Sequence, residues 1–230
     1  MKKIVAALML SALAAAPMCA CSSNNTQTVS IQEATEPEYR DEQGVGYNTL
    51  EDGSLTTVVA KKTILNAKIS SEYEGKKVTT IGRSTFKMAD IVSVEIEEGI
   101  TKIDDYAFAF CRNLTGIEIP DGVTVIGTNA FSGCTKLEKI ALPSTLEEIG
   151  MFSFDAVAAE KIDIPESVKK IDEYAFAQCG NLAEITIHSK DIEIAETAFE
   201  QCTNLKIIAP KNSTSIKLAQ NKGIDFEEAK

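Results

Sequence analysis

Apolar positions recur along the chain at intervals of 22 or 23 residues. Six phenylalanines mark this spacing, each with an isoleucine five residues earlier: Phe86, Phe108, Phe131, Phe154, Phe176 and Phe199. Five or six residues after most of them comes an apolar triplet such as Leu114, Ile117 and Ile119, whose last two members enclose one polar residue. This alternation predicts a half-buried strand in each unit. The chain is therefore predicted to be a series of similar units, of which the last begins its triplet with Leu205 and Ile208.

Each unit is predicted to be one coil of a stack. A turn containing proline ends the strand in several units, a short V-x-x-I segment leads back, and "DDYAFAFC" predicts a short helical turn that Asp104 can cap. One unit alone cannot bury both its phenylalanine and its triplet, whereas stacked neighbours can. We expect an α/β repeat solenoid over residues 78–210, with about six coils of 22–23 residues and a parallel sheet.

Both ends of the repeat region look like caps. Residues 45–77 are predicted to hold a β-hairpin, with its turn at Asp52 and Gly53, followed by a degenerate first coil. Residues 211–230 are predicted to form the other cap. There Ser213 can begin a helix over residues 214–222, Gly223 can end it, and a closing strand can follow.

The start of the chain has the pattern of an export signal. Two lysines precede an apolar stretch that is shorter than the roughly 20 residues of a membrane span, and small residues follow. The residues around Cys21 resemble a bacterial lipobox, so residues 1–20 are predicted to be a lipoprotein signal peptide and Cys21 the lipidated residue. Residues 21–44 are then a flexible tether. The alternative is simple cleavage that releases an unanchored protein.

Charge and composition narrow the possible functions. The formal net charge is −11, which argues against nucleic acid and against an anionic membrane as partners of the folded part. Tryptophan is absent and His188 is the single histidine, in a predicted turn and without a recognisable partner. We find no nucleophile–base pair and no calcium-loop or phosphate-loop motif, so we predict no enzyme activity, no cofactor and no metal.

Four cysteines stand three residues after a repeat phenylalanine: Cys111, Cys134, Cys179 and Cys202. Their regular spacing predicts a column along the stack, which does not suit a zinc site because zinc ligands converge on one point. We interpret them as buried thiols that pack as small apolar groups. A disulfide within the pair Cys111–Cys134 or the pair Cys179–Cys202 remains open.

The repeat resembles that of a known protein family. The pattern V-x-x-I-G-x-x-A-F-x-x-C-x-x-L-x-x-I-x-I-P is similar to the BspA-like leucine-rich repeat of bacterial surface proteins. Ala89 and Val157 depart from it by replacing the cysteine, and Glu97 and His188 by replacing the proline. The resemblance implies a leucine-rich-repeat solenoid and an adhesin-like role in contacts with a host or matrix.

Two surfaces are candidates for such contacts. The first is the outer face of the strands, with the positions Glu95, Glu118, Glu138, Lys139, Glu160, Lys161, Asp163 and Glu184. The second is a possible aromatic stripe, two residues before the repeat phenylalanine, made of Tyr106, Phe152 and Tyr174. Aromatic residues can anchor a partner or pack between coils, and the sequence leaves both interpretations open here.

We therefore expect a non-catalytic lipoprotein of the cell envelope, in the outer membrane and exposed at the surface. Its expected partner is an extracellular or envelope macromolecule, such as a host matrix protein or a glycan, and the lipid anchor would be its sole membrane contact. The alternative is a scaffold on the periplasmic side that binds a bacterial envelope partner.

Overall fold

The computed structural model describes residues 37–229. The predicted signal peptide, the lipidation at Cys21 and most of the predicted tether lie outside these residues. Within them the chain winds into about eight turns of a parallel-sheet solenoid, two more than the six coils counted in the sequence. The additional turns lie at the two ends, where the repeat pattern is degenerate.

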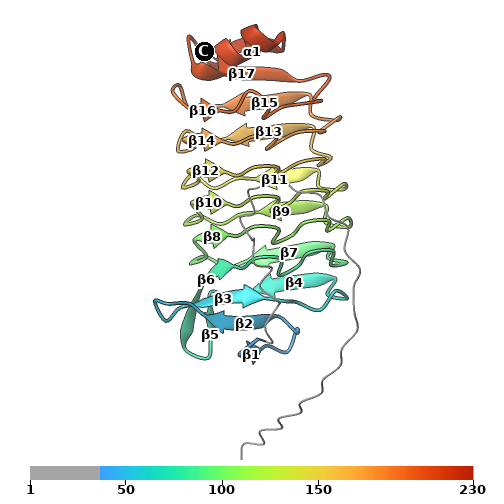
Figure 1. Ribbon diagram of the computed structural model, residues 1–230, viewed down its shortest axis with the longest axis vertical. Coiled ribbons are helices and arrows are strands. Elements are labelled where there is room, and N and C mark those ends of the chain that lie inside the picture. The colour runs from blue at the N-terminus through green and yellow to red at the C-terminus, as the bar shows by residue number, and fades with distance from the viewer. Residues whose placement is uncertain (1–36, 230) are drawn as a thin grey trace, which may run out of the picture. The chain divides into compact units, whose positions relative to one another are not determined.

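Each turn except the last supplies one strand to each of two parallel stacks, and the last turn has helix α1 in place of a strand of the first stack (Figure 1). The first stack consists of β3 (Leu55–Val58), β6 (Lys76–Ile81), β8 (Lys102–Ile103), β10 (Val125–Ile126), β12 (Glu148–Ile149), β14 (Lys170–Ile171) and β16 (Glu193–Ile194). The second consists of β4 (Asn66–Ile69), β7 (Ser93–Ile96), β9 (Gly116–Glu118), β11 (Lys139–Ala141), β13 (Lys161–Ile164), β15 (Glu184–Ile187), β17 (Lys206–Pro210) and β18 (Asp225–Ala229). Corresponding residues of successive coils thus lie side by side, as the repeat predicts.

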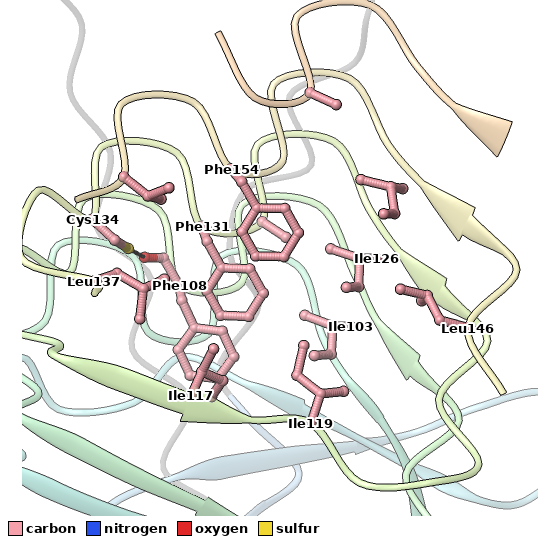
Figure 2. Packing of buried hydrophobic residues seen from close by; sticks show 14 of the residues in the cluster. Ile103, Phe108, Ile117, Ile119, Ile126, Phe131, Cys134, Leu137, Leu146 and Phe154 are labelled. Atoms are coloured by element: carbon pink, nitrogen blue, oxygen red, sulfur yellow. Dashed lines mark hydrogen bonds between the residues drawn. The ribbon is translucent and has the colours of Figure 1, made fainter. Parts of the chain in front are cut away.

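The repeat phenylalanines form a continuous stack through the core. The ring centroids of successive members from Phe86 to Phe199 lie 5.1, 5.2, 5.2, 5.5 and 5.8 Å apart, with nearly parallel planes. Figure 2 shows Phe108, Phe131 and Phe154 in line, with Ile103 and Ile126 on one side and Cys134 and Leu137 on the other. Each inner ring is covered by the rings of its two neighbours, so each coil buries apolar surface that the next coil would otherwise expose.

The segment around each phenylalanine is not helical, contrary to prediction. In the second predicted coil, Ala107 donates its N–H to Asp104 O and Cys111 donates to Phe108 O, which closes two successive tight turns. Tyr106 and Phe110 have φ values of 58° and 60°, as the third residue of a type II turn requires. The N–H of Phe108 donates to Ala130 O of the next coil at 2.8 Å. Backbone groups that a helix would pair internally therefore bridge the coils.

The N-terminal cap contains the predicted hairpin. Strand β2 (Gly46–Thr49) pairs antiparallel with β3, and the turn between them holds Gly53 at a φ of 85°. A further strand, β1 (Tyr39–Arg40), lies inside the segment predicted as tether and pairs with β2. It is held there because Tyr39 packs against Tyr73 of β5 (Glu72–Tyr73).

The C-terminal cap has the predicted form. Helix α1 (Thr214–Lys222) begins after Ser213, whose hydroxyl accepts a hydrogen bond from Ile216 N at 3.2 Å, and it ends at Gly223 in the left-handed conformation. Strand β18 then pairs in parallel with β17. In the part of the chain that the structure describes, no helix combines the length and the apolar character needed to cross a membrane.

The register of the last repeat strand differs from the prediction. Ile207 pairs with Ile185 and points into the core, Ala209 is also buried, and Ile208 lies in the outward column beside Thr186. The sequence analysis instead assigned Ile208 to the core. Because residues 207 and 208 are both isoleucine, the alternation fits either register there, and a one-residue slip exchanges the two faces.

Candidate recognition surface

The second strand stack presents one long exposed face, which we call the strand face. It comprises the outward side chains of β4, β7, β9, β11, β13, β15 and β17 and the residues just before them. Inward and outward side chains alternate along each strand because of the pleat, as in β13, where Ile162 and Ile164 are buried and Lys161 and Asp163 are exposed. The parallel register aligns these outward positions across the coils.

All eight sequence-predicted positions lie on the strand face. Glu95, Glu118 and Asp163 belong to one outward column, in which Ala141 stands opposite Glu118 and Thr186 opposite Asp163. Lys139, Lys161 and Glu184 belong to a parallel column. Glu138 and Glu160 immediately precede β11 and β13 at the edge of the face. Glu184 is half-buried and the other seven side chains are exposed.

Ion pairs run across the C-terminal half of this face. Lys161 Nζ lies 3.2 Å from Glu184 Oε1, and Lys206 Nζ lies 3.8 Å from Glu184 and 3.1 Å from Glu227. The hydrogen bond to Glu227 and the nearby carboxylates raise the pKa of Lys206. Because the lysines of these pairs are solvent-exposed, each pair contributes little to stability, and the pairs neutralise part of the acidic charge on this half of the face.

The N-terminal half of the face is acidic. Lys68 Nζ contacts Glu95 and Glu97 at 3.0 Å each, and the pKa of Lys68 is raised by these hydrogen bonds, first the one to Glu95. The pKa of Glu97 is lowered by the N–H of Ser71 and then by Lys68. The carboxylate of Glu118 has no lysine or arginine nitrogen within 4.0 Å among residues 37–229.

Three hollows adjoin one another on the strand face around Ala141. The largest, about 670 Å³, lies across the ends of β7, β9 and β11 and is lined by Val94, Glu95, Ile96, Glu98, Glu118, Ile119, Pro120, Asp121, Ala141, Leu142, Pro143 and Ser144. A second lies between Glu118, Lys139 and Lys161. The third lies beside Asp163, Pro165 and His188. The sequence reasoning missed Glu98 and Asp121, because they follow the strands in turns.

His188 is part of this surface. Its Nε2 lies 2.6 Å from Asp163 Oδ1. The sequence analysis expected His188 to be a turn residue, and it does follow β15 with an exposed side chain. Its partner was missed, because Asp163 lies diagonally across from it in the neighbouring coil. Neither member of the pair is hydrogen bonded to a serine, threonine or cysteine side chain in the described part of the chain.

The aromatic candidates occupy the turns, away from the strand face. Phe152 and Tyr174 stack on each other at 4.8 Å, while Tyr106 is separated from them by Asn129 and lies under the Arg83 and Lys87 cations at 5.7 and 5.0 Å. All three aromatic side chains are half-buried. The structure therefore brings two of them together in packing between coils and leaves the third apart.

The four cysteines form the predicted column and are free thiols. Each Sγ also donates a hydrogen bond to the carbonyl of the phenylalanine one coil earlier, as Cys111 does to Phe86 O at 3.0 Å and Cys134 to Phe108 O at 3.1 Å (Figure 2). Contact with Cys111 and burial raise the pKa of the Cys134 thiol, which keeps its proton in place. Among residues 37–229, no group of three or more His, Cys, Asp or Glu residues is arranged to hold a metal ion.

Parallel strand columns, stacked phenylalanines and an open strand face define the class of protein as a leucine-rich-repeat solenoid. The family model described as BspA type Leucine rich repeat region matches residues 63–115 and 101–222 in six copies. The chain belongs to this BspA-type leucine-rich repeat family.

Solved structures agree with this assignment. A leucine-rich repeat protein from Bacteroides ovatus is 26% identical, with a TM-score of 0.62 over 75% of this chain and 55% of that one. The Treponema pallidum (T. pallidum) leucine-rich repeat protein is 19% identical, with a TM-score of 0.58 over 80% of this chain and 96% of that one, and shows likeness of fold alone. The chain thus spans about half of the B. ovatus protein. No curated protein matches.

Proposed function

We propose that this protein recognises a macromolecule at the bacterial cell envelope without catalysing a reaction, and that the strand face is its binding surface. One observation carries the proposal: the fold aligns charged residues from six successive coils on one exposed face with adjoining hollows. Repeat proteins use such extended faces for binding. The family and its bacterial relatives support a role in recognition.

The proposal includes anchoring through a lipid on Cys21 and exposure at the outer surface, where a host matrix protein or a glycan would be within reach. Protease treatment of intact cells, followed by blotting for the repeat domain, tests the location. Loss of the domain while periplasmic markers survive supports surface exposure. Protection in intact cells, with digestion after lysis, would place the domain inside and favour an envelope partner.

Binding assays with charge-reversed variants test the face. We expect Glu118→Lys and Asp163→Lys to weaken binding of the macromolecule that the wild-type protein captures. Glu173→Lys is the matched control, because it reverses an exposed carboxylate in a turn away from the strand face. Equal binding by all three variants would contradict the proposed face.

A further inference from the structure

Two strand positions with almost no side chain open this part of the strand face: Ala141 borders the groove across β7, β9 and β11, and Gly116 borders the adjoining hollow beside Lys139. Gly116 and Ala141 occupy outward positions on adjacent strands, where the next coils carry Lys139, Lys161 and Asp163. Both small residues border the hollows on the strand face, Ala141 all three of them and Gly116 the one beside Lys139. The opening therefore results from residue choice at these positions.

The backbone does not require glycine at position 116. A Cβ atom added there would meet Lys139 Cβ at 3.4 Å, which is ordinary contact, and the residue has no positive φ. At Gly127, by contrast, an added Cβ would lie 2.7 Å from the backbone nitrogen of Asp105. Glycine inside a strand costs about 0.5–1 kcal/mol relative to alanine. A glycine that weakens a strand without a steric need can mark a site that another chain approaches closely.

The lining of the groove matches the side chain of lysine or arginine. Its floor is apolar, with Ile119, Leu142 and Pro143, and its rim carries Glu98 and Glu118. These two carboxylates have no lysine or arginine nitrogen within 4.0 Å among the described residues, whereas Glu95 is already paired with Lys68. Lysine and arginine bury an aliphatic stem on apolar surface and keep the charged head at a polar rim.

We propose that this groove binds an extended basic segment of a protein partner, with one lysine or arginine side chain seated between Glu98 and Glu118. The inference rests on the proposed function and adds the chemistry of the partner. The carboxylates of the groove are spread along two coils instead of converging, and no group of acidic residues in the described part of the chain is arranged to hold a metal ion. An extended segment places alternate side chains on one face and so matches this spread.

The test uses the full chain and a fluorescent peptide of alternating lysine and serine as the probe. We expect Ala141→Gln to weaken peptide binding by about tenfold or more, which is about 1.4 kcal/mol or more. Gly116→Gln fills the adjoining hollow and should have a smaller effect. Both variants leave the net charge unchanged, so they separate this site from general attraction to an acidic protein. Gly180→Gln is the matched control, because Gly180 is an exposed glycine, not at positive φ, with nothing within 4 Å of an added Cβ. Thermal unfolding checks that each variant folds.

Charge variants complete the test. Glu98→Gln and Glu118→Gln should lower the affinity for the basic peptide and reduce the salt dependence of its binding. A peptide of alternating glutamate and serine should not bind. Wild-type affinity of Ala141→Gln for the basic peptide would overturn the inference, as would absence of binding to the wild-type protein. If a captured macromolecule or glycan still depends on Asp163 and Glu118 while the peptide does not bind, the basic-segment inference fails and the proposed function stands. If every strand-face variant binds the captured partner as well as the wild type does, the proposed function fails.

Discussion

Each repeat cysteine ties its coil to the preceding one through a single hydrogen bond. The thiols of Cys111, Cys134 and Cys179 are fully buried, and each donates to a phenylalanine carbonyl. Val157 fills the equivalent position in the remaining inner coil without a donor. The position thus requires a small apolar side chain first, and the hydrogen bond adds to it.

Replacement of Cys134 by valine separates these two contributions. The apolar volume is kept and the bond to Phe108 O is lost, so we expect the free energy of unfolding to fall by about 1 kcal/mol. Urea denaturation measures the change, and Cys202→Val, at a half-buried site, provides the comparison. Unchanged stability of Cys134→Val would show that the thiol acts through packing alone.

The carboxyl of Asp155 makes the free energy of unfolding depend on pH. Burial raises the pKa of its carboxyl, Oδ2 accepts a 3.3 Å hydrogen bond from Ser132 Oγ, and Oδ1 is buried without a partner. A carboxyl with a raised pKa in the folded state binds its proton more tightly there than in the unfolded chain. Its contribution to the free energy of unfolding therefore decreases as the pH rises through the interval between the two pKa values.

We expect Asp155→Asn to be more stable than the wild type at pH 7, because the amide removes the buried negative charge. The advantage should shrink as the pH falls through the acidic range, where the wild-type carboxyl is protonated. Thermal midpoints of both proteins across this range measure the difference. A variant less stable than the wild type at neutral pH would contradict the account.

At the scale of secondary-structure elements, the sequence predicted correctly those features that depend on interactions between residues close in the chain. The bounds of α1 follow from Ser213 and Gly223, whose capping bonds join residues close in sequence. The turns around the phenylalanines were misread as helical because half of their hydrogen bonds go to the next coil, which no local pattern shows. The strand-face positions were predicted from the repeat register. The His188–Asp163 pair joins neighbouring coils diagonally, and the same register could have revealed it.

Substitutions in the phenylalanine stack should lower the free energy of unfolding most. Phe131 is fully buried with a stacked ring on each side, so Phe131→Ala should lower the free energy of unfolding by about 3–5 kcal/mol. Phe199 has one stacked neighbour at 5.8 Å and is 6% exposed, so Phe199→Ala should cost less. Urea denaturation of the two variants measures this order, and a larger loss at Phe199 would contradict it.

For the whole molecule, stability is shared between neighbouring coils, because each coil contacts mainly the coils before and after it. The strand face is a product of that repetition, and its local character comes from the few positions where the repeat is broken. Ala141 opens the groove, Gly116 opens the adjoining hollow, and Lys68 neutralises Glu95 at the N-terminal side of the groove. The repeat thus determines where the candidate surface lies, and individual substitutions determine its chemistry.

The C-terminal cap protects the last coil. Helix α1 buries Ile216 and Ala219 against the core, and β18 covers the edge of β17. A chain ending at Pro210 would leave that edge unpaired and the apolar interior of the last coil exposed, which favours association between chains. We expect this truncated protein to form oligomers in size-exclusion chromatography with light scattering. Hydrogen exchange should show protection lost first in β17 and β15 and retained near Phe108, since each coil depends on its neighbours. A monomeric truncated protein with wild-type protection of β17 would show that the stack is stable without the cap.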